Sequence, residues 1–133
     1  MRLKFILLAG LMAMSANAAA DTIYAGRQAC LEVLKVHPMR LQLTAKGEVS
    51  TSGWSAADLV ARTYEVPPED GILDLDFTAT RPTGIALTVI SPVSVKVQIT
   101  APEWLKGVRI HSNTTALELP LNNGVCTSDG LST

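Results

Sequence analysis

The sequence predicts an all-β protein: a small antiparallel β-sandwich (immunoglobulin-like) or a partly open barrel of about seven or eight short strands. Apolar and polar residues alternate from 93 to 100 and again from 72 to 78, which is the period of a strand with one buried face. Turn signals containing proline or glycine separate such segments, mostly at intervals of about ten to fifteen residues. No long helical period occurs between them, which favours packed sheets.

The two alternating segments define an inner and an outer face. From 93 to 100 the residues expected to face the core are Val93, Val95, Val97 and Ile99. From 72 to 78 the expected inner residues are Leu73, Leu75 and Phe77, while Asp74 and Asp76 face water. Further strands are expected at 31–36, 40–45, 84–90, 107–112 and 116–119, each bounded by turn residues.

The segment 55–66 fits two structures. Ser55 followed by Asp58 is an acidic variant of a helix capping box, and a helix would then run to Arg62. Residues 59–66 also resemble a strand that Pro67 ends, and we expect a strand after a capped turn. The choice between helix and strand for Ser55–Arg62 stays open.

The C-terminal region is expected to return to the sheet. Asn123-Gly124 suits a tight turn that brings a last strand, carrying Cys126, back beside 116–119. Residues 127–133 are expected to form a frayed polar tail.

The first residues have the pattern of a Sec-type signal peptide. Arg2 and Lys4 precede an apolar run from 5 to 14, and Ala16-Asn17-Ala18 ends it with an A-x-A cleavage pattern. Residues 1–18 are therefore expected to be removed, with Ala20 as a second cleavage position. The apolar run is roughly half of the ~20 residues that span a bilayer, so no membrane span is expected in the mature form. No cysteine follows Leu8-Ala9-Gly10, so a periplasmic or secreted protein, not a lipoprotein, is predicted.

The mature chain, 19–133, has the size of one domain. Its net charge changes from −1 to about −3 when Arg2 and Lys4 leave, so no electrostatic attraction to nucleic acid or anionic lipid is expected. Export places Cys30 and Cys126 where disulfides persist, and they lack the C-x-x-C spacing of a redox or metal pair. We expect them to form a structural disulfide.

An acidic group offers the best metal candidates. Alternate strand positions place Asp74 and Asp76 side by side, with Glu69 and Asp70 in the preceding turn, and calcium prefers such oxygen ligands. The D-x-D-x-D-G loop is missing, and carboxylates on a wet strand face are an ordinary protection of a sheet edge. Asp70, Asp74 and Asp76 are thus weak metal candidates, and no cofactor is expected.

Copper and nucleophilic catalysis receive less support. His37, Met39 and His111 are ligand types for copper, but no histidine or methionine follows Cys126 as a copper-thiolate site requires. Gly53-Trp54-Ser55-Ala56-Ala57 is one residue short of G-x-S-x-G, which acts on a strand-turn-helix elbow. Ser55 fits a cap or turn better. No catalytic residue is predicted, and the protein is not expected to be an enzyme.

Recognition is the function that remains. Trp54 and Trp104 lie beside turn signals and are candidate contacts for an extracytoplasmic protein or carbohydrate partner, although tryptophans also close the ends of small cores. Asn113-Thr114-Thr115 is a glycosylation sequon. The sequence favours a non-enzymatic binding module that uses its loops. A metal-binding or small hydrolytic protein built on 69–76 is an alternative.

A second alternative comes from one loop. Arg81-Pro82-Thr83-Gly84 resembles, in three letters, the N-P-T-T-G loop of chagasin-like cysteine-protease inhibitors, which are small exported β-sandwiches. The companion Gly-rich and R-P-W loops of that family are absent from this chain, so no site is transferred. We assign no family on these letters, and an inhibitor of a secreted hydrolase is kept as an alternative function.

Overall fold

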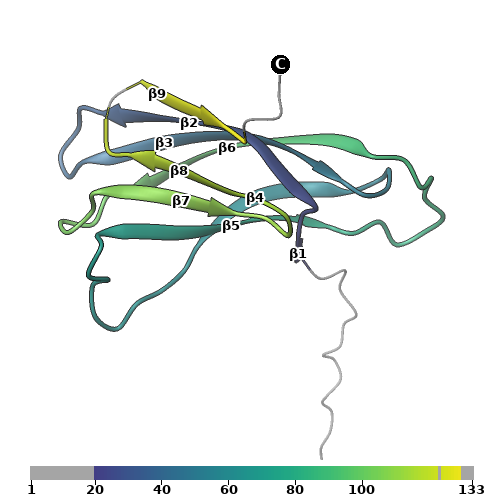
Figure 1. The fold of residues 1–133 in the computed structure, drawn as a ribbon, viewed down its shortest axis with the longest axis horizontal. Coiled ribbons are helices and arrows are strands. Elements are labelled where there is room, and N and C mark those ends of the chain that lie inside the picture. The colour runs from purple at the N-terminus through teal and green to yellow at the C-terminus, as the bar shows by residue number, and fades with distance from the viewer. Residues whose placement is uncertain (1–19, 123, 130–133) are drawn as a thin grey trace, which may run out of the picture.

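The computed structural model describes residues 20–122 and 124–129, which form nine strands in two sheets (Figure 1). These residues contain no helix, and the pairing within the sheets is mainly antiparallel. The predicted all-β sandwich is confirmed. The predicted signal peptide, residues 1–18, lies outside the described residues. No helical segment within the described ranges has the length and apolar character that a membrane crossing requires.

The first sheet is arranged around β5 (Ile72–Thr80). One edge of β5 pairs with β4 (Ser55–Ala61). The other edge pairs in parallel with β7 (Gly107–His111) and, further along, antiparallel with β1 (Ala20–Thr22). β7 then pairs with β8 (Ala116–Pro120).

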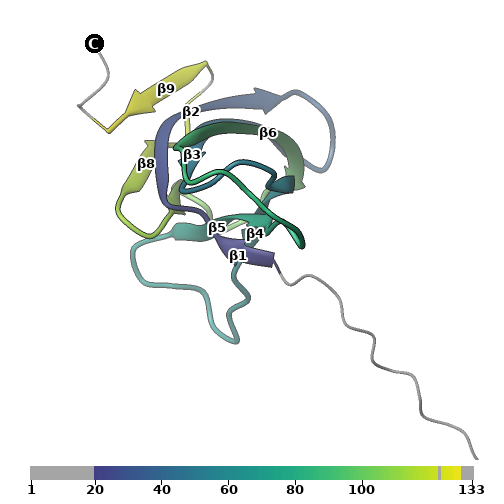
Figure 2. The ribbon, with the colours of Figure 1, turned by 90° about the vertical axis from the view of Figure 1, so that its right-hand side faces the viewer.

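The second sheet is fully antiparallel. Its order is β6 (Ser91–Thr100), β3 (Arg40–Val49), β2 (Ala25–Leu34) and β9 (Val125–Ser128). Figure 2 shows β2, β3 and β6 above β1, β4 and β5, with the core between the two layers. A sheet covered on one face and wet on the other explains the alternating sequence.

The core consists of the inward rows of both sheets. Leu75, Phe77, Leu41 and Leu43 are fully buried at its centre. Within the described ranges no polar or charged residue is buried, so the core carries no unpaired polar side chain. The inner residues expected on β5 are confirmed, and those expected on β6 pack against the core but are only half-buried.

The expected strand at 84–90 is wrong. This segment is an exposed connection between β5 and β6, and Ile85 is fully exposed. Across the gap its backbone bonds with Ser52: the Ser52 N–H donates to the Leu87 carbonyl at 3.0 Å, and the Leu87 N–H donates to Ser52 Oγ at 3.0 Å. A strand is held by a row of hydrogen bonds to a neighbouring strand. Here both bonds across the gap reach a single residue, Ser52, so no such row forms.

Residues 55–61 form a strand, so the helix alternative does not occur. The strand begins with a bulge: the register shifts between Ser55 and Asp58, and Ala56 adopts a left-handed φ of 54°. The strand also ends earlier than expected, because the chain leaves β5 after the Arg62 N–H donates to the Asp74 carbonyl at 2.9 Å.

The last strand takes a different neighbour from the one we expected. β9 pairs with β2 in the second sheet, not with β8. This register places Cys126 directly opposite Cys30, and the two form the predicted disulfide. Such a bond is compatible with an extracytoplasmic location. Thr127 and Ser128 belong to β9, so the strand runs further than we expected, and the rest of the predicted tail after Asp129 lies outside the described residues.

Candidate functional site

Several connections meet at one end of the sandwich. The β3–β4 connection (50–54) and the β5–β6 connection (81–90) project together at the right of Figure 1. The β7–β8 connection joins them, because the Asn113 N–H donates to the Ile23 carbonyl at 2.9 Å beside the β1–β2 junction. We call this region the loop end.

A hollow of about 400 Å³ lies between these connections. Its wall includes Tyr24, Trp54, Arg81 and Asn113. The indole N–H of Trp54 donates to Thr51 Oγ1 at 2.9 Å, and the Arg81 guanidinium lies 6.0 Å from the centre of the indole ring. The hollow therefore combines aromatic surface with polar groups, a mixture that suits oriented recognition.

Arg81 is positioned from both sides. It forms an ion pair with Asp21 on β1 and lies over Trp54 from the β3–β4 connection. Arg81 thus joins the β5–β6 connection, on which it lies, to β1 and to the β3–β4 connection. Its stacking over the indole also covers part of the Trp54 face, which leaves less of that face for a ligand.

Four exposed aliphatic side chains lie beside the hollow. Their exposed fractions are 104% for Ile85, 70% for Leu87, 51% for Val89 and 53% for Ile90. We call these four residues the apolar tip. Ala86, within the same segment, lines the hollow, so the two surfaces adjoin. Clustered exposed apolar side chains mark contact surfaces more often than isolated ones do.

The apolar tip is absent from our sequence-based candidates, because 84–90 was expected to be a strand. One signal was present: no charged residue occurs from 82 to 95. That charge-free run is longer than one strand of typical length. Its second half forms the start of β6, whereas its first half pairs with no described strand.

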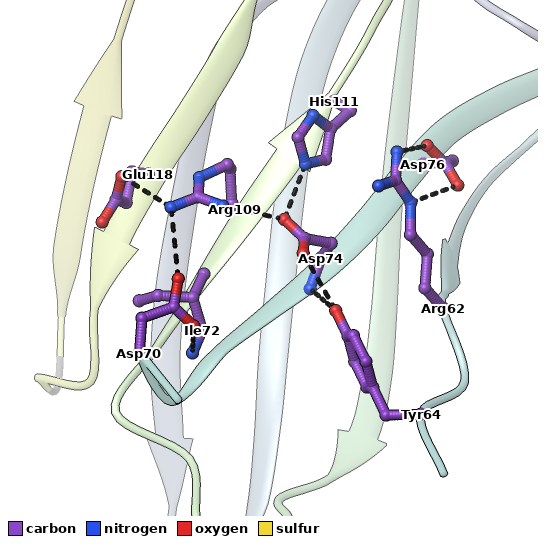
Figure 3. A network of polar contacts seen from close by, with 9 residues as sticks. All are labelled: Arg62, Tyr64, Asp70, Ile72, Asp74, Asp76, Arg109, His111 and Glu118. Atoms are coloured by element: carbon purple, nitrogen blue, oxygen red, sulfur yellow. Dashed lines mark hydrogen bonds and ion pairs between the residues drawn. The ribbon is translucent and has the colours of Figure 1, made fainter. Parts of the chain in front are cut away.

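The acidic segment forms a polar network on the outer face of β5 (Figure 3). Asp74 accepts hydrogen bonds from the Tyr64 hydroxyl at 2.9 Å and from Arg109 Nη1 at 3.1 Å, and its carboxylate lies 2.7 Å from His111 Nε2. The Asp74 N–H also donates to the Tyr64 hydroxyl oxygen at 3.0 Å. Arg109 and His111, both on β7, thus converge on one carboxylate.

These contacts set the ionisation of Asp74. Partial burial on its own would raise the pKa of Asp74, but the hydrogen bonds with His111 and Tyr64, with the charge of Arg109, lower the pKa below its ordinary value. The pKa of Asp76 is lowered chiefly by its hydrogen bonds with Arg62, whose Nη2 and Nε lie 2.8 and 3.1 Å from the two carboxylate oxygens. Both carboxylates are held in the charged form.

The three weak metal candidates are engaged by other groups. Asp74 and Asp76 face cationic or hydrogen-bonding side chains, and Asp70 accepts the Ile72 N–H at 3.0 Å while lying 3.9 Å from Arg109. In residues 20–122 and 124–129, no group of three or more His, Cys, Asp or Glu side chains is placed to hold a metal ion. The network can bind neighbouring segments together.

The residues considered for copper are not brought together. His37 and Met39 lie in the connection after β2, where the His37–Pro38 peptide is cis. His111 ends β7 next to Ser112, whose Oγ accepts the Gly26 N–H at the start of β2. The histidines therefore lie near opposite ends of β2. Ser55 is the first residue of β4 and pairs with Thr80, so it sits on no strand-turn-helix elbow.

Trp104 lies away from the loop end. It packs edge-to-face on Tyr64, with ring centres 5.9 Å apart, and contacts the core in the β6–β7 connection. A second hollow of about 290 Å³ lies here, with Ala61, Ile99 and Trp104 in its wall. Because β6 begins at the loop end and finishes here, the two tryptophans form no common surface.

The comparisons with known proteins return no relatives. No family model, no curated protein and no solved structure matches this chain.

Proposed function

We propose that this chain is an exported, non-enzymatic binding module whose loop end holds a protein partner. The observation that carries the proposal is the apolar tip. Complete burial of a fully exposed aliphatic side chain contributes about 1.5–3 kcal/mol, so Ile85 and Leu87, the two most exposed of the four, offer the largest share of the binding free energy.

The surroundings of the apolar tip fit a protein interface. Such interfaces have an apolar centre and a polar rim, and they are enriched in aromatic and arginine side chains relative to the rest of the surface. Tyr24, Trp54 and Arg81 supply side chains of these kinds in the hollow beside the tip. Trp54, which the sequence suggested as a contact, would therefore touch the same partner as the apolar tip, because it lines the adjoining hollow.

A carbohydrate partner would use the hollow and leave the apolar tip bare. Sugars stack on open aromatic faces, and the Trp54 face is partly covered by Arg81. The exposed aliphatic surface favours a protein.

A binding experiment with a matched control tests this. The double variant Ile85→Ser, Leu87→Ser removes the two most exposed apolar tip side chains, and Val60→Ser changes a 46% exposed valine on β4, outside the loop end. Proteins from the envelope and medium of the producing cell that bind the wild type and Val60→Ser should be lost from the double variant. Identical protein lists for all three chains would contradict the proposal.

The inhibitor alternative has one structural observation in its favour. Arg81–Gly84 lies in the projecting β5–β6 connection, next to the apolar tip, where a protease cleft has access to it. A panel of papain-like proteases assayed with the protein at micromolar concentration tests this alternative. Inhibition that the variant Pro82→Gly, Thr83→Gly weakens would support it, whereas full protease activity throughout would exclude it.

A further inference from the structure

β6 is the longest strand with an unpaired edge in the part of the chain that the structure describes. All ten of its residues pair with β3, and no described strand pairs with its other edge. The direction of its backbone groups follows from one bond. The Ala101 N–H donates to the Met39 carbonyl at 2.9 Å, so odd-numbered residues point their N–H groups toward β3.

The even-numbered residues of β6 therefore point outward. Ser94, Lys96, Gln98 and Thr100 each present an N–H and a carbonyl along the free edge. Pro92 belongs to the same set and lacks an N–H, as suits a residue whose nitrogen faces solvent on an edge strand. The register with β3 has no bulge, so this row of groups is regular.

The other edges are shorter or blocked. β8 has five residues and β9 has four. β4 has a bulge at Ala56, and the Asp58 carboxylate accepts the outward Leu59 N–H at 2.8 Å. Bulges and short strands are the usual protection of an edge against pairing with another chain. Among the described edges, β6 alone combines length with regularity.

The inner face of β6 is also incompletely covered. Val93, Val95, Val97 and Ile99 are half-buried, whereas the corresponding residues of β3, such as Leu41 and Leu43, are fully buried. Near Ile99 the second hollow separates β6 from the end of β4. An added strand would pair the free edge and extend the apolar row at once.

We propose that two copies of this chain associate through β6, edge to edge and antiparallel about a two-fold axis. The four-stranded sheet of each copy then becomes half of one continuous sheet. A second copy suits this edge because β6 is complementary to itself: its inner row is aliphatic from Val93 to Ile99, and its outer row carries a single charge, Lys96.

One register satisfies the edge best. With Val97 opposite Val97 of the second copy, Ser94 pairs with Thr100 and Lys96 pairs with Gln98, so all four outward donors meet one another. Val95 then lies opposite Ile99 on the inner face. A shift that places Lys96 opposite Lys96 brings like charges together, which is unfavourable, and leaves Pro92 opposite Thr100.

This arrangement has a consequence for the loop end. β6 begins next to Ile90, so an antiparallel pair directs the two apolar tips toward opposite ends of the dimer. Such a dimer would present two separated contact surfaces and could join two partners.

Sedimentation of the protein over about 1 μM to 1 mM tests the proposal. The wild type should approach twice the monomer mass as its concentration rises. Gln98→Pro removes an outward N–H that β3 does not use, and it should remain monomeric, with Gln98→Ala as the control for side-chain loss. Thermal melting that matches between these two variants shows that the fold persists.

Two charge variants test the register without altering the backbone. Gln98→Glu places a carboxylate opposite Lys96 twice in each dimer and should lower the dissociation constant about 2- to 30-fold, whereas Gln98→Lys should raise it by a similar factor. Equal shifts for both variants would overturn the register. A wild type that stays monomeric at all concentrations would overturn the dimer. The dimer would also be overturned if the β6 amides are protected from hydrogen exchange by a partner protein and not by a second copy of this chain.

Discussion

Asp74 joins three separate segments through one carboxylate. It lies on β5, Arg109 and His111 come from β7, and Tyr64 comes from the connection after β4 (Figure 3). The Asp74 side chain is 18% exposed, so its charge keeps some contact with solvent while its oxygens are also paired with the neighbouring side chains. The network therefore connects the outer face of the first sheet to the chain that leaves β4.

The lowered pKa of Asp74 makes stability depend on pH. Because the carboxylate has a lower pKa in the folded state than the ordinary 3.8, its stabilising effect is complete above about pH 4 and is lost as the pH falls through the folded-state pKa. Asp74→Asn should lower the free energy of unfolding near neutral pH, and its difference from the wild type should shrink in acid. Urea unfolding at several pH values measures this, and a difference that is independent of pH would contradict it. Glu103→Gln, on an exposed residue, controls for charge loss.

Gly47, on β3, lies very close to the start of β2 and to the residues just before it. A Cβ placed there would lie 2.5 Å from the Ala25 carbonyl oxygen and 2.6 Å from Ile23 Cδ1. Gly47→Ala should therefore destabilise the fold by about 1–3 kcal/mol or more, because backbone must move. Gly84→Ala has nothing within 4 Å of its new Cβ and should change stability by less than about 0.5 kcal/mol. Denaturant unfolding compares the two, and equal effects would be inconsistent with this packing.

Single strands were predictable where two conditions coincided: alternation in sequence and a neighbour in space. Residues 72–78 and 93–100 met both conditions and became β5 and β6. The segment 84–90 has strand-forming composition but no neighbour along its length, so it became the exposed connection that carries the apolar tip. Strand propensity reflects how well side chains pack on neighbouring strands, and for 84–90 the rest of the fold supplies no such neighbours.

β9 is held to β2 by four residue pairs and by the Cys30–Cys126 disulfide. Arg27 on β2 also pairs with Asp129, directly after β9. The chain-entropy model gives on the order of 4–5 kcal/mol for a bond that closes a loop of about 100 residues.

Cys30→Ala, Cys126→Ala should thus lower the free energy of unfolding by up to about 4–5 kcal/mol, as measured by denaturant unfolding. A reductant should bring the wild type to the stability of the double variant and leave the variant unchanged. A wild type that is insensitive to full reduction would contradict the role of this bond.

In the whole molecule, the stable core and the proposed contact surface are separate. The core lies between the sheets, whereas the apolar tip projects beyond one end and contributes no buried side chain. Stability and binding should therefore respond to different substitutions.

A comparison of two variants measures that separation. Ile85→Ser, Leu87→Ser should leave the free energy of unfolding within about 0.5 kcal/mol per site of the wild type while it abolishes partner binding. Leu75→Ala, at a fully buried position, should cost about 2–5 kcal/mol. A large loss of stability in the tip variant would show that the segment packs against the core and is not free to bind.

The order of amino acids alone predicted the all-β class, the inner rows of β5 and β6, and the Cys30–Cys126 pair. Alternation with a period of two can be recognised within one segment, and two cysteines allow only one pairing within the chain. The partner of β9, the end of β4 and the exposure of 84–90 depended on which edges the other strands had already taken. Convergence on Asp74 likewise required β5 and β7 to lie side by side, a parallel pairing between segments that are far apart along the chain. Contacts of that kind are selected by packing of the whole chain, so only the folded molecule reveals where the polar network, the apolar tip and the free edge of β6 lie.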